Sequence, residues 1–186
     1  MGMHVVLTGP STAGKTSLML GLTRLEGDVT FNLERTLTTR ERRPNEGDEE
    51  NEFLTNEQFL ERQAQGLLFT FGPDDGRYQY GITHPEPVKE SEIRMRILRP
   101  HHATYFRTLV DTPTIICAVS PYETDPRAAF LRRDPQADPE DILERLSRFH
   151  RDQEEARDVA DIHFQNQFGL DAAVQKLSHA ILAVAL

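Results

Sequence analysis

A segment near the start of the chain has the residue types and the spacing that bind a chain of phosphates. The pattern G-x-x-x-x-G-K-[ST] is satisfied by Gly9-Pro10-Ser11-Thr12-Ala13-Gly14-Lys15-Thr16, and Ser17 follows it. Glycines permit backbone angles that turn successive N–H groups inward, Lys15 adds a mobile positive charge, and the Thr16 hydroxyl can coordinate Mg²⁺. The segment therefore predicts a site for a nucleoside triphosphate, with ATP and Mg²⁺ as the expected ligands.

The residues on either side supply the elements that such a loop needs. Residues 4–8 are a short apolar run that ends at Gly9, as a buried parallel strand does. After the loop, Leu18, Leu22 and Leu25 recur at helical spacing, and Gly27 is a suitable stop. A strand, a glycine-bearing turn and a helix in this order separate a phosphate loop from a chance match.

Alternating strands and helices continue after residue 87. Strands are expected at residues 93–98, 114–119 and 162–165, and helices at residues 103–110 and 170–184. The longest helix is expected to begin at Pro139 with Asp138 as its N-cap. This alternation predicts an α/β fold of the P-loop NTPase class, a sandwich around a parallel central sheet with a helical lid.

The segment between residues 31 and 81 differs in character. It is rich in charge and contains one clear helix, which Thr55 and Gln58 cap and Gly66 ends. An apolar run at residues 67–71 and a turn at residues 72–76 are expected to follow. We interpret residues 1–186 as one domain, with core and lid at 1–30 and 82–186 and a small acceptor-binding insertion at 31–81.

Charge and composition exclude some classes of function. The formal net charge of −9 disfavours nucleic acid as a partner, because such binding depends on a basic surface. No apolar run reaches the length of about 20 residues that a membrane span needs, so we expect a cytoplasmic protein without membrane contact. The single Cys117 lies in an apolar run and is expected to be buried and inert. A small phosphorylated substrate remains the expected partner, and the oligomeric state stays open.

The motifs resemble those of the guanylate kinase family over nearly the whole chain. The loop start Gly9-Pro10-Ser11 has that family's form, and Thr38-Thr39-Arg40, with the following Arg43, Glu46-Gly47 and Phe53, resembles the opening of its acceptor-binding region. Gly66 with Leu67 and Leu68, then Tyr80-Gly81, resembles the next landmark, and Asn166 resembles a position near the adenine.

The resemblance implies a set of functional residues. Arg40, Arg43 and Tyr80 would grip a phosphate of the acceptor, a task that suits the planar arginine fork. Arg145 and Arg133, whose place Arg132 could take, would be lid arginines that stabilise the charge of the transferred phosphoryl group, as would Lys15. From the residues alone, a solvated charge run for Arg40 to Arg43 and ordinary i,i+4 ion pairs for the lid arginines stay open. The acceptor side would also include Thr36, Thr70 and Arg99.

Three departures from the family pattern bear on the acceptor. Thr70 stands where guanylate kinases use a glutamate to read guanine, and Asn51 stands in place of a tyrosine. Arg96 and Arg99 stand where the family carries acids. The ribose 1,5-bisphosphate phosphokinases, a branch of the same superfamily, likewise lack the base-reading glutamate and the acids, and they have an arginine near the position of Arg99. The resemblance therefore favours ribose 1,5-bisphosphate as the acceptor and phosphoribosyl diphosphate as the product, with nucleoside monophosphate kinase and a non-catalytic binding module as alternatives.

Other polar residues leave alternatives open. The period-two pair Arg94 and Arg96 could line the site or form the solvent face of an edge strand. No general base is evident, and Asp74, Asp75 and Glu92 cannot be separated as candidates for one. The acidic run at residues 48–50 is interpreted as a solvated loop, with a role in holding Mg²⁺ as the alternative. His101-His102 is interpreted as a helix start or surface pair.

Overall fold

A parallel sheet forms the centre of the molecule. The computed structural model describes residues 2–42, 46–74, 77–122, 125–133, 135–167 and 169–185. Within these ranges the central sheet has the strand order β2-β7-β1-β8-β9, and all four pairings are parallel. Its strands are β1 (Met3–Thr8), β2 (Thr30–Leu33), β7 (Glu92–Ile97), β8 (Thr114–Pro121) and β9 (Ile162–Asn166). The expected P-loop NTPase architecture is confirmed.

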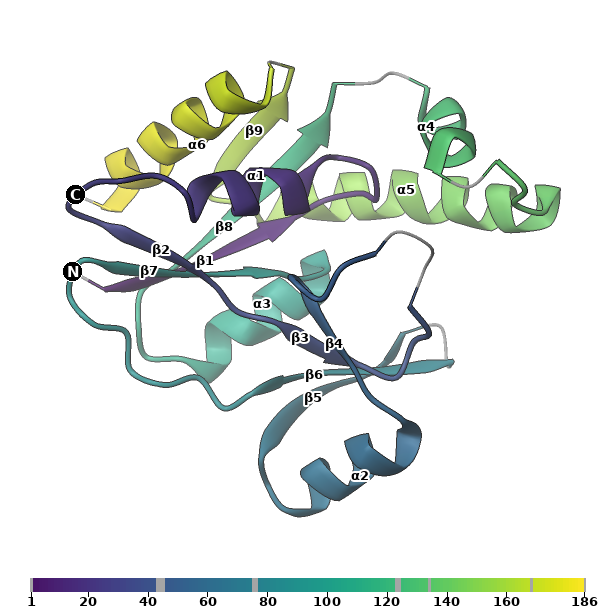
Figure 1. Ribbon diagram of the computed structural model, residues 1–186, viewed down its shortest axis with the longest axis horizontal. Coiled ribbons are helices and arrows are strands. Elements are labelled where there is room, and N and C mark those ends of the chain that lie inside the picture. Colours follow the sequence, from purple (N-terminus) through teal and green to yellow (C-terminus); the bar gives the residue numbers. More distant parts are fainter. Residues whose placement is uncertain are drawn as a thin grey trace.

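Helices cover both faces of this sheet, as a parallel sheet requires. Figure 1 shows α1 (Lys15–Leu22) and α6 (Leu170–Ala185) together on one side of the sheet and α3 (Pro100–Leu109) on the other, where α5 (Pro139–Val159) packs against α3 and β8. The alternation along β1 divides the core accordingly. Val5 and Leu7 join the cluster under α1 and α6, whereas Val6 joins Phe106 and Ile116 under α3.

A second, smaller sheet lies beside the central one and carries Thr36, Thr70 and Tyr80, which the sequence assigned to the acceptor side. Its strand order is β4-β3-β6-β5, and α2 (Asn56–Ala64) packs on it through Phe59 against Leu37 and Leu68 (Figure 1). The strands are β3 (Thr36–Thr38), β4 (Asn51–Phe53), β5 (Leu68–Asp74) and β6 (Tyr78–Thr83). The capping box of Thr55 and Gln58 is present, and Gly66 follows the helix at φ 66°, both as predicted.

Two helices, α4 (Pro126–Arg133) and α5, project from the core beyond β8 (Figure 1). The Asp138 side chain accepts a hydrogen bond from the Glu140 N–H, which confirms the predicted N-cap. Phe130 of α4 packs against Ile142 and Phe149 of α5. These contacts hold the two helices together as a lid unit.

Other expectations were wrong in detail. Part of the segment expected as a turn at residues 72–76 is a strand instead, since β5 continues as far as Asp74 after a register shift between Thr70 and Gly72. Residues 75 and 76 lie outside the described part of the chain. Helix α1 ends at Leu22 rather than near Leu25. Cys117 is buried as expected, and burial raises the pKa of its thiol to about 12, so it stays protonated. No helix in the described part of the chain combines the length and the apolarity that crossing a membrane requires.

Candidate active site

The phosphate loop connects β1 to α1 at the carboxyl end of the central sheet. Gly9 has φ 120° and Gly14 has φ 83°, backbone angles that only glycine adopts readily. A Cβ on Gly9 would lie 2.4 Å from the carbonyl oxygen of Val119, and one on Gly14 would lie 2.4 Å from Nδ2 of Asn166. Both glycines are therefore required by backbone angle and by space. Thr12 at φ 70° carries a strained turn between them.

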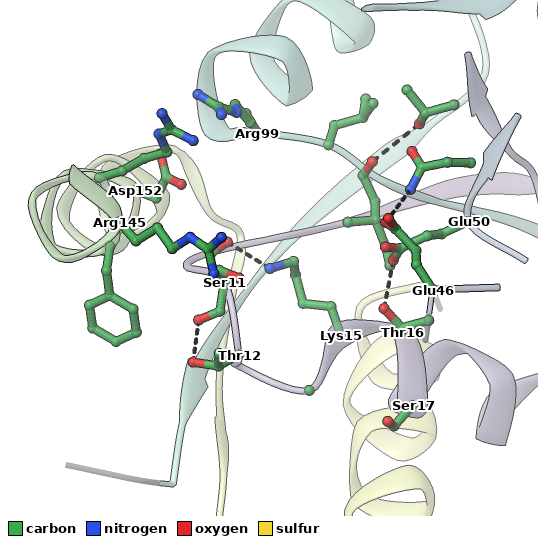
Figure 2. A pocket seen from close by; sticks show the side chains of 18 of the residues that line it. Ser11, Thr12, Lys15, Thr16, Ser17, Glu46, Glu50, Arg99, Arg145 and Asp152 are labelled. Atoms are coloured by element: carbon green, nitrogen blue, oxygen red, sulfur yellow. Dashed lines mark hydrogen bonds between the residues drawn. The ribbon is translucent and has the colours of Figure 1, made fainter. Parts of the chain in front are cut away.

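Lys15 folds back over this loop. Its Nζ donates hydrogen bonds to the carbonyl oxygens of Gly9, at 2.8 Å, and of Pro10, at 2.7 Å. Figure 2 shows the side chain extended along the loop beside Ser11 and Thr12. The ammonium group thus lies at the mouth of the ring of loop amides, where β- and γ-phosphates of a nucleotide would bind.

A cleft of about 770 Å³ extends from the loop to the smaller sheet and to the lid. It brings together most of the residues that the sequence nominated. From the loop side and the acceptor side these are Gly9, Ser11, Thr12, Gly14, Lys15, Thr16, Ser17, Thr36, Arg40, Tyr80, Arg99 and, from the lid, Arg145. Parallel sheets bind ligands outside the carboxyl ends of their strands, and the cleft lies there.

Some nominated residues lie elsewhere. Thr70, in β5, does not line the cleft, and neither do Pro10 and the buried Ala13. Asn166 contacts the loop rather than the cleft, since its Nδ2 donates to the carbonyl oxygen of Ala13 at 3.0 Å. It ties the end of β9 to the phosphate loop. Arg43 and the side chain of Arg133 lie outside the described part of the chain.

Arg40 is held by an ion pair at the wall of the cleft that the sequence assigned to the acceptor, which is called the acceptor wall below. Its guanidinium donates to both carboxylate oxygens of Glu46, at 2.7 and 3.0 Å, and lies 5.4 Å from the Phe53 ring centroid. Burial disfavours the charge, but the bonds to Glu46 and the nearby Tyr80 outweigh it and hold the pKa of Arg40 above its usual value. Arg40 thus pairs with an acid and still faces the cleft, so the two interpretations open at the sequence level are compatible.

Thr36 lines the cleft, and its hydroxyl binds to the backbone of β7. It is buried, and its hydroxyl donates to the carbonyl oxygen of Ile97 at 3.3 Å. The bond joins the first residue of β3 to the last residue of β7, so it holds the smaller sheet against the central one.

Arg94 and Arg96 do not line the cleft, and neither interpretation offered for them is right. Strand β7 lies inside the sheet between β2 and β1, so these side chains do not lie on a free edge, and the guanidinium of Arg94 pairs with Glu34 and Glu92. Arg96 is 1% exposed, pairs with Glu34 at 2.8 Å and lies 5.5 Å from the Phe106 ring centroid. Burial lowers its pKa. Of the three arginines at positions 94, 96 and 99, the one that lines the cleft is Arg99, just beyond the end of the strand.

Glu92 is excluded as a general base for this cleft. It lies at the amino end of β7, opposite to the end that carries the phosphate loop, and its carboxylate accepts hydrogen bonds from Asn32 and Arg94. Asp75 and the side chain of Asp74, the other two candidates, lie outside the described part of the chain.

The sequence reasoning missed Asp152, which lies on α5 and faces the cleft (Figure 2). The side chain is buried, and burial raises the pKa of its carboxyl, an effect that the charges of Arg99 and Lys15 partly offset. Helical spacing could have found it. Arg145, Phe149 and Asp152 follow one another at intervals of four and three residues, so they share one face of α5.

Two further cleft residues differ in part from what the sequence indicated. His102, expected at a helix start or on the surface, is indeed in the first turn of α3 but is buried, and its ring stacks on Phe71 with centroids 4.5 Å apart. Glu50, expected in a solvated loop, accepts a hydrogen bond from the Thr16 hydroxyl at 2.6 Å (Figure 2). No local sequence pattern predicts such a contact, because Glu50 and Thr16 are 34 positions apart in the chain.

The lid arginine Arg145 combines the two roles that the sequence left open. Its guanidinium pairs with Asp141 one turn earlier, at 2.6 Å, and also lines the cleft. Arg132 and Arg148 line the cleft from the same pair of helices. The lid therefore presents positive charge to whatever lies on the phosphate loop.

Some known proteins are similar to this chain in sequence or in fold. No model of a known protein family matches the chain. A guanylate kinase from Thermotoga maritima is 39% identical over 149 residues, which is 78% of this chain and 70% of that protein. A guanylate kinase from Corynebacterium jeikeium is 33% identical over 96 residues, an alignment that spans 51% of this chain and only 50% of that relative.

A solved structure agrees in fold. The crystal structure of guanylate kinase from Anaplasma phagocytophilum superposes with a TM-score of 0.65 at 17% identity, covering 98% of this chain and 85% of that one. At that identity the match concerns the architecture alone, but the Thermotoga relative extends it to sequence over most of both proteins. The chain therefore belongs to the guanylate kinase family, whose P-loop kinases are ATP-dependent phosphotransferases.

Proposed function

We propose that this chain transfers the γ-phosphate of ATP to ribose 1,5-bisphosphate, which gives ADP and phosphoribosyl diphosphate. The observation that carries the proposal is the composition of the acceptor wall. Arg40, Tyr80 and Arg99 line the cleft, whereas Thr70, at the position that resembles the guanine-reading glutamate, does not line it. The wall is equipped for phosphate and lacks the carboxylate expected there for a base.

The loop residues support ATP as the phosphoryl donor. The amides between Gly9 and Gly14 and the ammonium group of Lys15 form an anion site at the start of α1. The Thr16 hydroxyl is a hard oxygen ligand that suits Mg²⁺, a metal that takes few protein ligands and keeps phosphate oxygens and waters for the rest. Consistent with that habit, the described residues contain no cluster of three or more His, Cys, Asp or Glu side chains able to hold a metal. Bound Mg²⁺ would neutralise charge on the β- and γ-phosphates.

The charge of the cleft suits two ligands that are both rich in phosphate. Among the described residues, the cleft is lined by six cationic side chains against four carboxylates: Lys15, Arg40, Arg99, Arg132, Arg145 and Arg148 against Glu46, Glu49, Glu50 and Asp152. The protein as a whole carries a net charge of −9. A local excess of arginine inside an acidic protein is expected where multiply charged anions bind.

The aromatic groups near the acceptor wall also argue against a base. His102 stacks on Phe71 with ring planes 17° apart, so one face of Phe71 is already covered. Tyr80 lies near the same imidazole, with the centroids of the Tyr80 and His102 rings 6.3 Å apart. A purine would have to displace this imidazole to stack on that face of Phe71, whereas a ribose needs no aromatic face.

The chemical step needs no general base from the protein. An oxygen of the acceptor phosphate attacks the γ-phosphorus, the bond from that phosphorus to the bridging oxygen breaks, and ADP leaves with the electron pair. A phosphate oxygen is already ionised, so there is no proton to remove. The tasks left to the chain are to align the two phosphates through Lys15 and Arg40 and to stabilise the developing charge through the lid residue Arg145.

Guanylate kinase activity is the second candidate, and the relatives favour it. The Thermotoga protein that is 39% identical to this chain is named as a guanylate kinase. Arg40 and Tyr80 would bind a nucleoside monophosphate as well as a sugar phosphate, because in both acceptors a phosphate oxygen attacks the γ-phosphorus of ATP.

An acceptor panel separates the two. ADP production should be followed with ribose 1,5-bisphosphate, GMP, AMP, CMP and UMP at equal concentration and with ATP and Mg²⁺ in excess. We expect turnover of the sugar bisphosphate at least about 100-fold above that of GMP, a ratio typical of a site that lacks the partner for a substrate group. Faster turnover of GMP would overturn the proposal in favour of guanylate kinase activity. Tight ATP binding without turnover of any acceptor would show a binding module.

A further inference from the structure

Glu50 reaches from the acceptor side of the cleft to the metal side. It immediately precedes β4, and its carbonyl oxygen accepts the N–H of Thr36 at 2.9 Å, so its backbone is fixed to the smaller sheet. Its carboxylate oxygen Oε2 accepts the hydroxyl proton of Thr16 at 2.6 Å, in the first turn of α1 (Figure 2). This bond joins the segment that binds the acceptor to the helix that begins at the phosphate loop.

The direction of this bond matters for a hydroxyl that coordinates a metal. A threonine hydroxyl has one proton and two lone pairs, and it can offer a lone pair to a cation only if the proton points elsewhere. A carboxylate has no proton to donate and can only accept, so Glu50 fixes the Thr16 proton on its own side. The lone pairs are then turned away from Glu50 and toward the cleft.

Glu50 also differs from its acidic neighbours in the partners it has. Glu46 pairs with Arg40, and Asp48 pairs with Arg42. Among the described residues, the recorded partner of the Glu50 side chain is a hydroxyl rather than a cation. A carboxylate beside a triphosphate site raises its local negative charge, which is unfavourable unless a cation also binds there.

We propose that Glu50 is a positioning residue for Mg²⁺: it orients the Thr16 hydroxyl toward the metal and adds a negative charge just outside the coordination sphere. The proposal rests on the proposed function, because it assumes a magnesium–nucleotide complex on the loop. Outer partners of this kind fix the orientation of a ligand and strengthen the binding of the metal. Because Glu50 is anchored to β3, the same contact couples the metal site to the acceptor-binding sheet.

The test measures binding of ADP by calorimetry, once with excess Mg²⁺ and once with EDTA. The ratio of the two dissociation constants reports the contribution of the metal. In Glu50→Gln we expect this ratio to shrink by about tenfold while the affinity in EDTA stays within about twofold of the wild type, since outer-shell substitutions commonly cost about 10- to 100-fold in metal affinity. Glu49→Gln, the adjacent charge-matched change, should alter the ratio by less than about twofold.

A double-substitution cycle separates positioning from a structural effect. In a Thr16→Val background, which lacks the hydroxyl, Glu50→Gln should change the ratio clearly less than in the wild type, because only the effect of its charge remains, whereas in a Thr16→Ser background it should act as in the wild type. Equal effects of Glu50→Gln and Glu49→Gln, or an undiminished effect of Glu50→Gln beside Val, would overturn the inference. A wild-type protein that binds no ADP would instead overturn the proposed function itself, and the inference with it.

Discussion

Arg40 and Glu46 form a two-point ion pair at the wall of the cleft, with the two guanidinium nitrogens 3.0 and 2.7 Å from the two carboxylate oxygens. The side chain of Arg40 is 12% exposed and that of Glu46 only 4%. The acid thus lies behind the arginine and holds its planar face in one orientation. A guanidinium fixed in this way loses little rotamer entropy when it binds a phosphate.

Replacement of Arg40 by lysine tests that orientation. Lysine keeps the charge but cannot form the two parallel bonds, so it would leave Glu46 half satisfied and place its charge less accurately. We expect KM for the acceptor to rise at least about tenfold while KM for ATP changes less than about twofold. Steady-state kinetics with each substrate varied in turn measures both. Arg42→Lys is the matched control, because Arg42 is exposed and pairs with Asp48; an equal effect there would contradict a special role for Arg40.

Replacement of Lys15 by methionine tests the phosphate loop. The ammonium group is held at the mouth of the loop by the carbonyl oxygens of Gly9 and Pro10, and methionine has similar length without charge. We expect kcat to fall by at least about 100-fold, because catalysis of phosphoryl transfer is mostly electrostatic. Lys89→Met is the control, since Lys89 is exposed and precedes the amino end of β7. Near-normal turnover of the Lys15 variant would refute the mechanism.

Arg99 should act on the choice of acceptor. It follows β7, lines the cleft and lies near enough to Asp152 for its charge to influence that carboxyl. If it contacts the second phosphate of a bisphosphate acceptor, Arg99→Ala should lower kcat/KM for ribose 1,5-bisphosphate by about 10- to 100-fold, the range expected when a charged hydrogen bond is lost. Residual turnover of GMP should change much less. Arg157→Ala, an exposed arginine at the end of α5, controls for net charge. A uniform loss with every acceptor would place Arg99 on the nucleotide instead.

Local signals made the phosphate loop and the long helix predictable. The loop is specified by residues that are adjacent in sequence, and Asp138 with Pro139 marks the start of α5 directly. The smaller sheet could not be predicted, because β3 and β4 each contain only three residues and every residue of β3 is buried. Such strands owe their conformation to their neighbours in the sheet rather than to alternation in their own sequence.

Arg96 shows why periodicity alone misplaced a cluster of charge. Period two correctly put Arg94 and Arg96 on one face of β7, but it cannot tell whether that face meets solvent, a ligand or a helix. In the fold the guanidinium of Arg96 lies over the ring of Phe106, a residue of α3, and it pairs with Glu34. The partner Glu34 is 62 positions away in the chain, so only the assembled sheet reveals it.

His4 should make the fold sensitive to mild acid. Its ring is buried against Phe106 at a centroid distance of 5.2 Å, and neither ring nitrogen has a hydrogen-bond partner among the described residues. Burial, reinforced by the charges of Arg96 and Arg94 and only weakly opposed by Glu92, lowers the pKa of His4 from 6.5 to about 4. Between these two pH values His4 is protonated in the unfolded chain but not in the folded chain. The free energy of unfolding therefore falls as pH drops from 6.5 toward 4.

The size of this effect follows from the shift. A difference of this kind corresponds to about 3 kcal/mol of unfolding free energy, at about 1.4 kcal/mol per pKa unit. Urea unfolding should measure the free energy of unfolding of the wild type and of His4→Leu at several pH values. Between neutral pH and pH 4 the wild type should lose about 3 kcal/mol more of this free energy than the variant. His163→Gln, an exposed histidine on β9, should follow the wild type throughout. If His4→Leu loses as much stability in acid as the wild type, His4 is not the group that causes the loss. The ion pair of Arg96 with Glu34 would then be the next group to test.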